Sequence, residues 1–259
     1  MSPNPSAFHY PLLIQISLWT HVGAAVLTLV KPSLWQWTLG VLVVDHLIIT
    51  AATLWPRSGW LGPNLLRLPD PQQRVAITID DGPDPAVTPK VLDILDQHDV
   101  KASFFCVGEK VRQHPELARE IVARGHTLEN HTDRHPHSFS VMGPKSIRKE
   151  IVSAQDIIRD ATGFTPRYFR APAGLRNAFL NRILFQNGLK QASWTRRGFD
   201  TVETNPDKVL ARLTHKLAAG DILLLHDGNA AGKTPIILEV LPRLLERIAQ
   251  KGLRASALP

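Results

Sequence analysis

Two adjacent carboxylates, Asp80 and Asp81, lie in the octapeptide TIDDGPDP at residues 78–85, which directly follows the apolar run of residues 75–77. Neighbouring like charges repel, and burying either one is costly unless a cation or a metal shares its charge. The alternative interpretation is a plain turn, because Asp-Gly and Gly-Pro pairs are common after strands. The octapeptide fits both interpretations, so the other polar groups of the chain must decide between a turn and a site.

Two histidines, His131 and His135, are four residues apart in the segment NHTDRH. This spacing can direct two imidazoles at one point, although two unrelated surface histidines can have it too. Two histidines and one aspartate from another strand end leave coordination positions open, which is typical of a catalytic divalent metal. One aspartate of the pair would then bind the metal, while the other accepts a proton from water.

Three further groups of polar residues follow predicted strands. They are residues 170–174 (RAPAG), Trp194 with Asp200, and residues 224–227 (LLHD). Arg170 is either a surface arginine before a turn or, if it faces Asp80, the cation that keeps this carboxylate ionised. His226 follows a strongly apolar run and is either a core histidine or a general acid at the mouth of a barrel.

The segments that carry these residues alternate with helix-like stretches. Apolar runs predict strands at residues 74–79, 101–106, 126–129, 167–170, 190–194, 221–226 and 253–257. Helical patterns occupy residues 88–98, 115–124, 144–161, 176–187, 206–219 and 234–251. This alternation predicts an α/β fold with a parallel sheet, and seven strands in about 185 residues favour a small barrel. Chemistry in such barrels gathers at the carboxyl ends of the strands, where Asp80 lies.

Two apolar segments precede this region. Residues 10–30 and 34–55 are each about 20 residues long, which is enough to cross a bilayer as a helix. We therefore predict a transmembrane hairpin in residues 1–57, a linker in residues 58–73 and a catalytic domain in residues 74–259. Two buried helices of a soluble protein are the alternative. A cleaved signal peptide is disfavoured, because the second apolar run would remain.

The charges that flank the hairpin bear on its orientation. Its short loop contains only Lys31, whereas Arg57, Arg67 and Arg74 follow the second segment. The positive-inside rule therefore favours a cytoplasmic catalytic domain at a bacterial-type inner membrane.

One acidic residue, Asp45, lies within the second apolar segment. An ionised carboxylate in a membrane needs a partner. We expect Asp45 to face the other helix and either pair with His21 or be protonated, with His46 pointing elsewhere.

The composition narrows the range of partners. The 259 residues carry a net charge of +7, but the basic residues are scattered and no nucleic-acid-binding motif is present. No nucleic-acid partner is therefore expected, whereas an anionic substrate, a membrane surface or a merely solvated surface fits this charge. Cys106 is the only cysteine, which excludes an intrachain disulfide, and its apolar surroundings predict a packed core thiol.

The five polar segments together resemble, in order, the motifs of the polysaccharide deacetylase family, also called the NodB-homology or carbohydrate esterase family 4 domain. The resemblance covers about residues 74–257. It implies a distorted (β/α)7 barrel that removes an N-acyl group, expected to be N-acetyl, from an amino sugar. The expected substrate is a glycan or an isoprenoid-linked sugar, the latter favoured by the hairpin and the basic surface. Zinc is the expected metal because it binds nitrogen and oxygen ligands tightly, and cobalt or manganese could replace it.

The resemblance also implies a role for each matching residue. The metal ligands are Asp81, His131 and His135. The catalytic residues are Asp80 as base, Arg170 as its orienting partner, His226 as general acid and Asp200, which tunes His226. The substrate-binding residues are Ala173, whose N–H holds the oxyanion, Leu224, which lines the acetyl pocket, and Trp194.

Two positions depart from the family pattern. Thr201 stands where tryptophan usually follows the aspartate of the fourth motif, and Glu129 stands where glycine is often found before the second motif. Both are expected in the wall of the substrate groove, so they bear on sugar specificity. The alternative functions are O-deacetylation or deformylation of a lipid-linked sugar, and carbohydrate binding at a membrane without catalysis.

Overall fold

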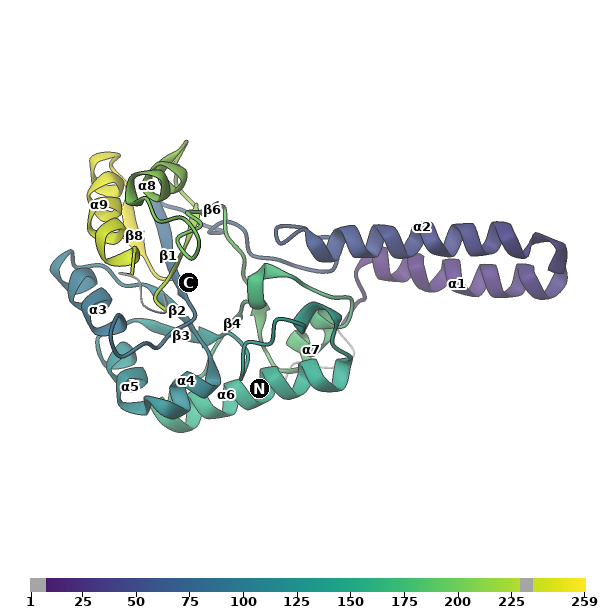
Figure 1. The fold of residues 1–259 in the computed structure, drawn as a ribbon, viewed down its shortest axis with the longest axis horizontal. Helices are drawn as coiled ribbons and strands as arrows, with labels where there is room; N and C mark the ends of the chain where they lie inside the picture. The colour runs from purple at the N-terminus through teal and green to yellow at the C-terminus, as the bar shows by residue number, and fades with distance from the viewer. Residues whose placement is uncertain (1–7, 229–234) are drawn as a thin grey trace.

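A curled sheet of parallel strands with helices around it forms the body of the molecule, and a hairpin of two long helices projects from it (Figure 1). This computed structural model describes residues 8–228 and 235–259. The strands are β1 (Arg74–Asp80), β2 (Ser103–Cys106), β3 (Thr127–Asn130), β4 (Tyr168–Phe169), β5 (Lys190–Gln191), β6 (Arg196–Arg197), β7 (Ile222–His226) and β8 (Arg254–Ser256). The α-helices of the body are α3 (Thr88–Gln97), α4 (Gly108–Gln113), α5 (Pro115–Ala123), α6 (Pro144–Thr162), α7 (Leu180–Gln186), α8 (Pro206–Thr214) and α9 (Ile237–Gln250).

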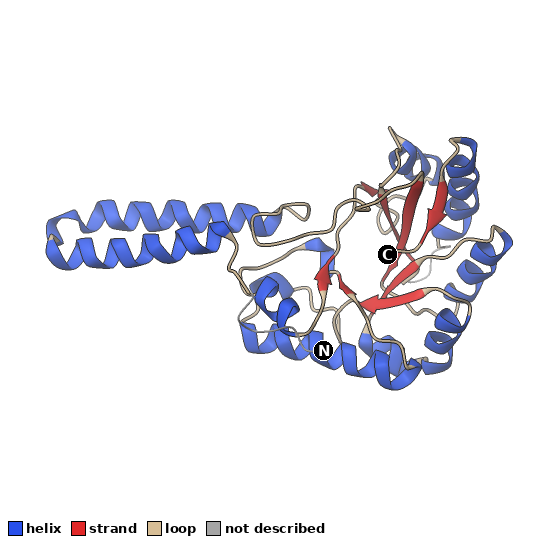
Figure 2. Cartoon of the chain, turned by 180° about the vertical axis from the view of Figure 1, so that it is seen from behind, coloured by secondary structure: helices blue, strands red, loops and turns tan. Residues whose placement is uncertain are grey.

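The register of the central strands aligns their carboxyl ends. The strand order is β5-β4-β3-β2-β1-β7-β6, and β8 also pairs with β1. Asp80 at the end of β1 lies opposite both Phe105 and His226, and Asn130 at the end of β3 lies opposite Cys106. All these pairings are parallel, so the polar segments that follow the strands meet at one edge of the sheet. The predicted α/β fold with a parallel sheet is confirmed, and the sheet is curled (Figure 2).

The sheet differs from the prediction in its strand count and in its closure. The described residues form eight strands rather than seven, because β6 consists of two arginines and has no apolar run that would reveal it. No pairing joins the end strands β5 and β6 within the described parts of the chain. The segment before β1 forms two isolated bridges, from Leu65 to Ala192 just after β5 and from Arg67 to Asp221 just before β7.

The segment predicted as a linker, residues 58–73, packs against the body. Its side chains Leu61 and Leu68 are buried. The buried guanidinium group of Arg176 donates hydrogen bonds to the carbonyl oxygens of Ser58 at 2.7 Å and Gly62 at 3.1 Å. The loop that carries Arg176 is therefore held by the segment, and α7 begins only at residue 180, although a helix was predicted from residue 176.

The hairpin consists of α1 (Leu12–Val30) and α2 (Trp35–Leu54), joined by a short 3-10 turn at Pro32–Leu34. Both helices are long and apolar enough to cross a membrane. Only 11% of the first apolar stretch and 17% of the second are buried, whereas a helix of a soluble core would be mostly buried. These exposed apolar faces indicate membrane anchoring and do not fit two core helices.

Asp45 lies buried between the two helices, as expected. Its Oδ2 accepts a hydrogen bond from the Ser17 hydroxyl at 2.7 Å and lies 3.8 Å from Nδ1 of His21. The expectation that His46 points elsewhere is wrong, because its Nδ1 lies 4.0 Å from the same oxygen. A hydrogen bond between that Nδ1 and the Leu42 carbonyl folds the ring back along α2 towards Asp45.

Candidate active site

A buried ion pair lies at the carboxyl end of β1. Arg170 is fully buried and donates a hydrogen bond from Nη1 to Oδ1 of Asp80 at 2.6 Å. Two further donors of its guanidinium group reach the carbonyl oxygens of Ala192 at 3.3 Å and Ser193 at 2.9 Å. A buried ion pair persists when additional hydrogen bonds complete both partners. Arg170 therefore fixes the Asp80 carboxylate, and the interpretation of residue 170 as a surface arginine is excluded.

The neighbouring carboxylate, Asp81, faces two histidines. Its Oδ1 lies 3.3 Å from Nε2 of His131 and 3.4 Å from Nε2 of His135. Nδ1 of His131 lies 2.8 Å from the Arg170 carbonyl oxygen, which can only accept, so Nδ1 carries a proton and Nε2 is the nitrogen that faces Asp81. The left-handed backbone of Asp81, with a φ of 76°, separates its direction from that of Asp80.

These three side chains fit a divalent metal. Ligand atoms at about 2.0–2.2 Å around a tetrahedral metal lie roughly 3.3–3.5 Å from one another. The two distances from Asp81 to the histidines lie in this range. Three protein ligands leave one position for water or substrate, which is the pattern of a catalytic rather than a structural site.

The pKa values of Asp81 and His135 favour the protonation states that bind a metal. Burial by itself would raise the pKa of Asp81, but its hydrogen bond to His131 and the nearby histidine charges outweigh burial and hold that pKa well below its usual range. Burial, reinforced by the neighbouring His131, lowers the pKa of His135 to about 4. At neutral pH Asp81 is therefore ionised and His135 is neutral, as metal binding requires.

The imidazole of His226 is held by a second carboxylate. Its Nδ1 lies 2.9 Å from Oδ1 of Asp200, and its backbone N–H donates to the other oxygen of Asp200 at 2.8 Å. Burial acts to lower the pKa of His226, but the charge and hydrogen bond of Asp200 raise it above its usual value. The pair can therefore carry a proton on Nε2 at neutral pH, and a core histidine without a function does not account for it.

One pocket of about 280 Å³ gathers these groups. Its lining includes Asp80, Asp81, His131, His135 and His226 together with Ala173, Trp194 and Leu224. Arg170 and Asp200 support the pocket from behind through the contacts given above. All ten residues singled out from the sequence thus meet at one place, although they come from segments that are far apart along the chain.

The same pocket contains four residues that were not among the predicted catalytic, metal-binding or substrate-binding residues. They are His137, Gly174, Arg197 and Thr201. Thr201 was expected in the groove wall. Arg197 lies in β6, and its guanidinium group stacks on Trp194 at 5.4 Å and on Phe199 at 5.0 Å. An arginine between two aromatic residues in the sequence could have indicated a role for Arg197. This signal could be used only if the strand β6 had been predicted.

The expectation for Glu129 is wrong. This residue is fully buried within β3 and is not among the lining of the pocket. Its Oε2 accepts hydrogen bonds from the backbone N–H groups of Arg167 at 2.8 Å and Tyr168 at 2.7 Å. The carboxylate therefore holds the start of β4 against β3, because β4 is too short to pair along its length.

Asp227 packs against the loop that follows β1 and carries the paired aspartates. Its Oδ2 accepts a hydrogen bond from the Thr88 hydroxyl at 2.5 Å, and its backbone N–H donates to the Asp80 carbonyl at 3.2 Å. Burial raises the pKa of Asp227 to about 7. A Cβ on Gly82 would lie 2.5 Å from this carboxylate, which explains the glycine after the paired aspartates.

The sequence of this chain is similar to those of known proteins. Residues 67–192 match the family model described as polysaccharide deacetylase. A chitooligosaccharide deacetylase of Sinorhizobium fredii (strain NBRC 101917 / NGR234) is 31% identical over 213 residues, which are 79% of this chain and 94% of that protein. A peptidoglycan-N-acetylglucosamine deacetylase of Bacillus cereus is 30% identical over 190 residues, covering 72% and 87% of the two chains.

Solved structures share the fold. A peptidoglycan N-acetylglucosamine deacetylase superposes with a TM-score of 0.71 at 26% identity and covers 76% of this chain and 91% of its own. A family 4 carbohydrate esterase pseudoenzyme from Bacillus anthracis superposes with a TM-score of 0.68 at 26% identity, covering 75% and 66% of the two chains. Active and inactive proteins therefore share this fold, so catalysis must be argued from the side chains.

Proposed function

This chain belongs to the polysaccharide deacetylase family, and from that premise we propose that it is a metal-dependent hydrolase that removes an N-acetyl group from an amino sugar. One observation carries the proposal: a buried base, a three-residue metal cluster and a carboxylate-held imidazole face a single pocket. A protein that only binds carbohydrate would have no need of this combination.

The metal ligands are Asp81, His131 and His135, and zinc is the proposed metal because two imidazoles and a carboxylate suit it. When bound there, the metal supplies the Lewis acidity that polarises an amide carbonyl and lowers the pKa of water. The hydrogen bond from His131 to the Arg170 carbonyl supports this assignment, since metal-binding histidines usually donate their other N–H to such a group.

The reaction assigns one task to each remaining residue. Asp80, held by Arg170, accepts a proton from the water whose oxygen attacks the amide carbon. The N–H of Ala173 donates to the oxyanion that forms. His226 then donates its Nε2 proton to the sugar nitrogen as the C–N bond breaks, and the products are acetate and a free amine. Leu224 and Trp194 enclose the acetyl group and exclude bulk water.

The proposed substrate is an amino sugar on an isoprenoid phosphate in the bilayer. The pocket residue Gly174 lies against Pro56, two residues beyond the end of α2, and a Cβ on this glycine would lie 2.8 Å from the Pro56 Cβ. Ser193 also donates a hydrogen bond to the Pro56 carbonyl at 2.8 Å. A substrate anchored in the same membrane is thereby held close to the pocket wall.

Arg197 supports an anionic substrate. It lies in the pocket lining, and its buried Nε has no hydrogen-bond partner within residues 8–228 and 235–259. A phosphate oxygen of the carrier can accept from this guanidinium group. The proposed location is the inner membrane with the catalytic domain on the cytoplasmic side, for which the charges flanking the hairpin are the argument.

A substrate panel tests the proposal. The purified chain, with Asp80→Asn as an inactive control, is incubated with chitooligosaccharides, peptidoglycan fragments and polyprenyl-phosphate-linked N-acetylglucosamine, and released acetate and free amine are measured. We expect the lipid-linked sugar to react fastest. Turnover of only the soluble glycans would contradict the lipid-linked substrate. Release of formate, or of acetate without a new amine, would contradict N-deacetylation itself.

A further inference from the structure

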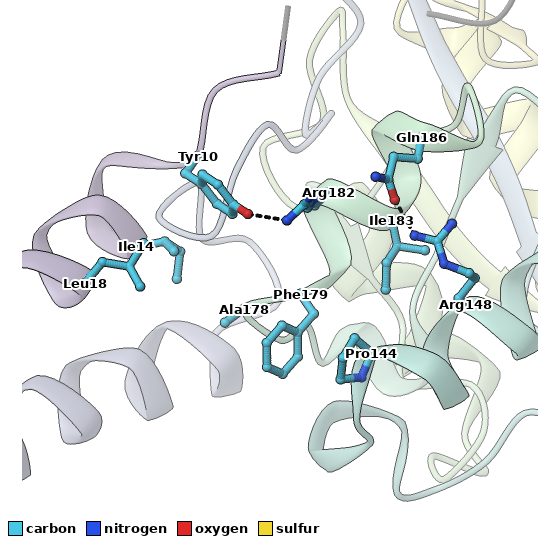
Figure 3. A pocket seen from close by; sticks show the side chains of 10 residues that line it. All are labelled: Tyr10, Ile14, Leu18, Pro144, Arg148, Ala178, Phe179, Arg182, Ile183 and Gln186. Atoms are coloured by element: carbon cyan, nitrogen blue, oxygen red, sulfur yellow. Dashed lines mark hydrogen bonds between the residues drawn. The ribbon is translucent and has the colours of Figure 1, made fainter. Parts of the chain in front are cut away.

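A second pocket, remote from the catalytic residues, lies where the hairpin meets the body (Figure 3). It has a volume of about 480 Å³. Its lining comes from the start of α1 and from α6 and α7, and consists of Tyr10, Ile14, Leu18, Pro144, Arg148, Ala178, Phe179, Arg182, Ile183 and Gln186. We propose that this junction pocket binds one anionic phospholipid of the surrounding bilayer.

The apolar side of the junction pocket suits an acyl chain. Ile14 and Leu18 lie one turn apart on α1, and Phe179 and Ile183 face them from the body (Figure 3). Phe179 is 50% exposed and Leu18 is 55% exposed, so two large apolar side chains remain uncovered at this junction. An acyl chain laid along them would remove this surface from water.

The polar side of the junction pocket suits a phosphate group. Arg182 donates a hydrogen bond to the Tyr10 hydroxyl, and Arg148 donates to the side-chain oxygen of Gln186. Each guanidinium group has five N–H donors, so one such bond leaves others for a ligand. None of the ten lining residues is acidic. The two positive charges therefore have no counter-charge in the pocket wall, and a phosphate would supply it.

The position of the junction pocket selects a lipid of the membrane as its occupant. Tyr10 lies two residues before the first residue of α1, Leu12, at the end of the hairpin nearest the body, and Arg182 of α7 contacts it there. Trp55 and Trp60 follow the end of α2 and pack edge to face, 6.2 Å apart, as aromatic residues of a membrane interface do. Basic side chains next to an apolar helix at this depth bind anionic headgroups.

Lipid binding to the full-length protein tests the inference. Native mass spectrometry would compare phosphatidylglycerol with phosphatidylcholine of the same acyl chains. We expect one tightly bound phosphatidylglycerol and on the order of thirtyfold weaker binding in Arg148→Gln/Arg182→Gln, from the loss of two charge contacts. Phe179→Ala, which alters an exposed side chain and no charge, should also weaken binding.

A matched control separates a site from general charge attraction. Lys90 on α3 and Lys149 on α6 are exposed and do not line the junction pocket. The double variant Lys90→Gln/Lys149→Gln loses the same net charge and should bind the lipid as the wild type does. An equal loss in this control, or equal binding of phosphatidylcholine, would overturn the proposal.

Inorganic phosphate distinguishes a lipid site from a simple anion site. Millimolar phosphate should not displace the bound phosphatidylglycerol, because the acyl chain supplies part of the affinity. Displacement by phosphate together with an unaltered Phe179→Ala variant would show that only an anion binds. Both measurements are independent of catalysis, so they test lipid binding separately from the proposed deacetylation.

Discussion

At the scale of single residues, the two adjacent aspartates differ in what surrounds them. Asp80 receives a hydrogen bond from a buried guanidinium group, whereas Asp81 faces two imidazoles. A carboxylate held by a fixed cation is oriented without a metal, whereas one that lies between two histidine nitrogens completes a ligand set. The structure therefore supports separate tasks for neighbours of identical chemistry.

Replacing each aspartate should separate these tasks. Asp81→Asn is expected to weaken zinc binding, because it removes an anionic ligand. Asp80→Asn should retain zinc but lose about 10²–10⁴-fold in kcat, because a general base is lost and a ligand is not. Elemental analysis and kcat measured on the same preparations check both results. Equal loss of metal from the two variants would contradict the division of tasks.

The contact between His226 and Asp200 predicts a change in pH dependence. Asp200 raises the pKa of His226, so the imidazole stays protonated to a higher pH than it otherwise would. A general acid is active below its pKa, and activity therefore declines as pH rises through that value. Asp200→Asn should move this alkaline limb of kcat to lower pH. A pH profile with an unmoved limb would show that Asp200 does not act on His226.

At the scale of elements, the turn after β4 must fit between the pocket and the hairpin. Gly174 has a φ of 75°, and a Cβ there would lie 2.4 Å from the Trp194 ring and 2.8 Å from Pro56. Gly163, at the end of α6, has a similar φ of 73°, but a Cβ there would meet nothing within 4 Å. The two glycines share a positive φ but differ in their surroundings.

These glycines form a matched pair of substitutions. Gly163→Ala should cost about 1 kcal/mol of unfolding free energy and leave kcat unchanged, because only backbone strain is added. Gly174→Ala should cost more and should also lower kcat/KM, because the Trp194 ring must move out of the pocket wall. Chemical denaturation and steady-state kinetics measure both. Equal effects of the two substitutions would show that the contact with Trp194 is unimportant.

At the scale of the whole molecule, the hairpin and the body are joined closely. The backbone N–H of Arg176 reaches the carbonyl of Thr53 at 3.4 Å, and Ile14, Ala52 and Leu61 form a small apolar cluster at the junction. The hairpin is therefore held at a fixed position relative to the catalytic pocket.

Cysteine labelling decides on which side of the membrane the body lies. Ser33 in the hairpin loop and Gly59 after α2 are both exposed, and the native Cys106 is fully buried, so it should not react. In intact cells, an impermeant maleimide should label Ser33→Cys and spare Gly59→Cys if the body is cytoplasmic. The opposite pattern would place the catalytic domain outside the cytoplasm.

The sequence alone determined those features that local pattern encodes. Strand ends could be recognised because each polar segment directly follows its own apolar run. The two helices that are long and apolar enough to cross a membrane could be recognised because length and apolarity are local properties. Parallel pairing then places strand ends at one edge, so the meeting of the polar segments there was predictable, whereas the role of each residue stays a prediction. The strand β6 was not, because two arginines form a strand only when β7 offers them a partner.

Only the tertiary structure decided which groups touch. The family resemblance implied that Arg170 orients Asp80, but the two residues are 90 positions apart, and their contact depends on side-chain direction at the end of β1. Burial of Glu129 and packing of residues 58–73 likewise depend on neighbours distant in the chain. The junction pocket exists only because α1 and α7 meet, and contacts of this kind are set by packing between elements rather than by the periodicity within them.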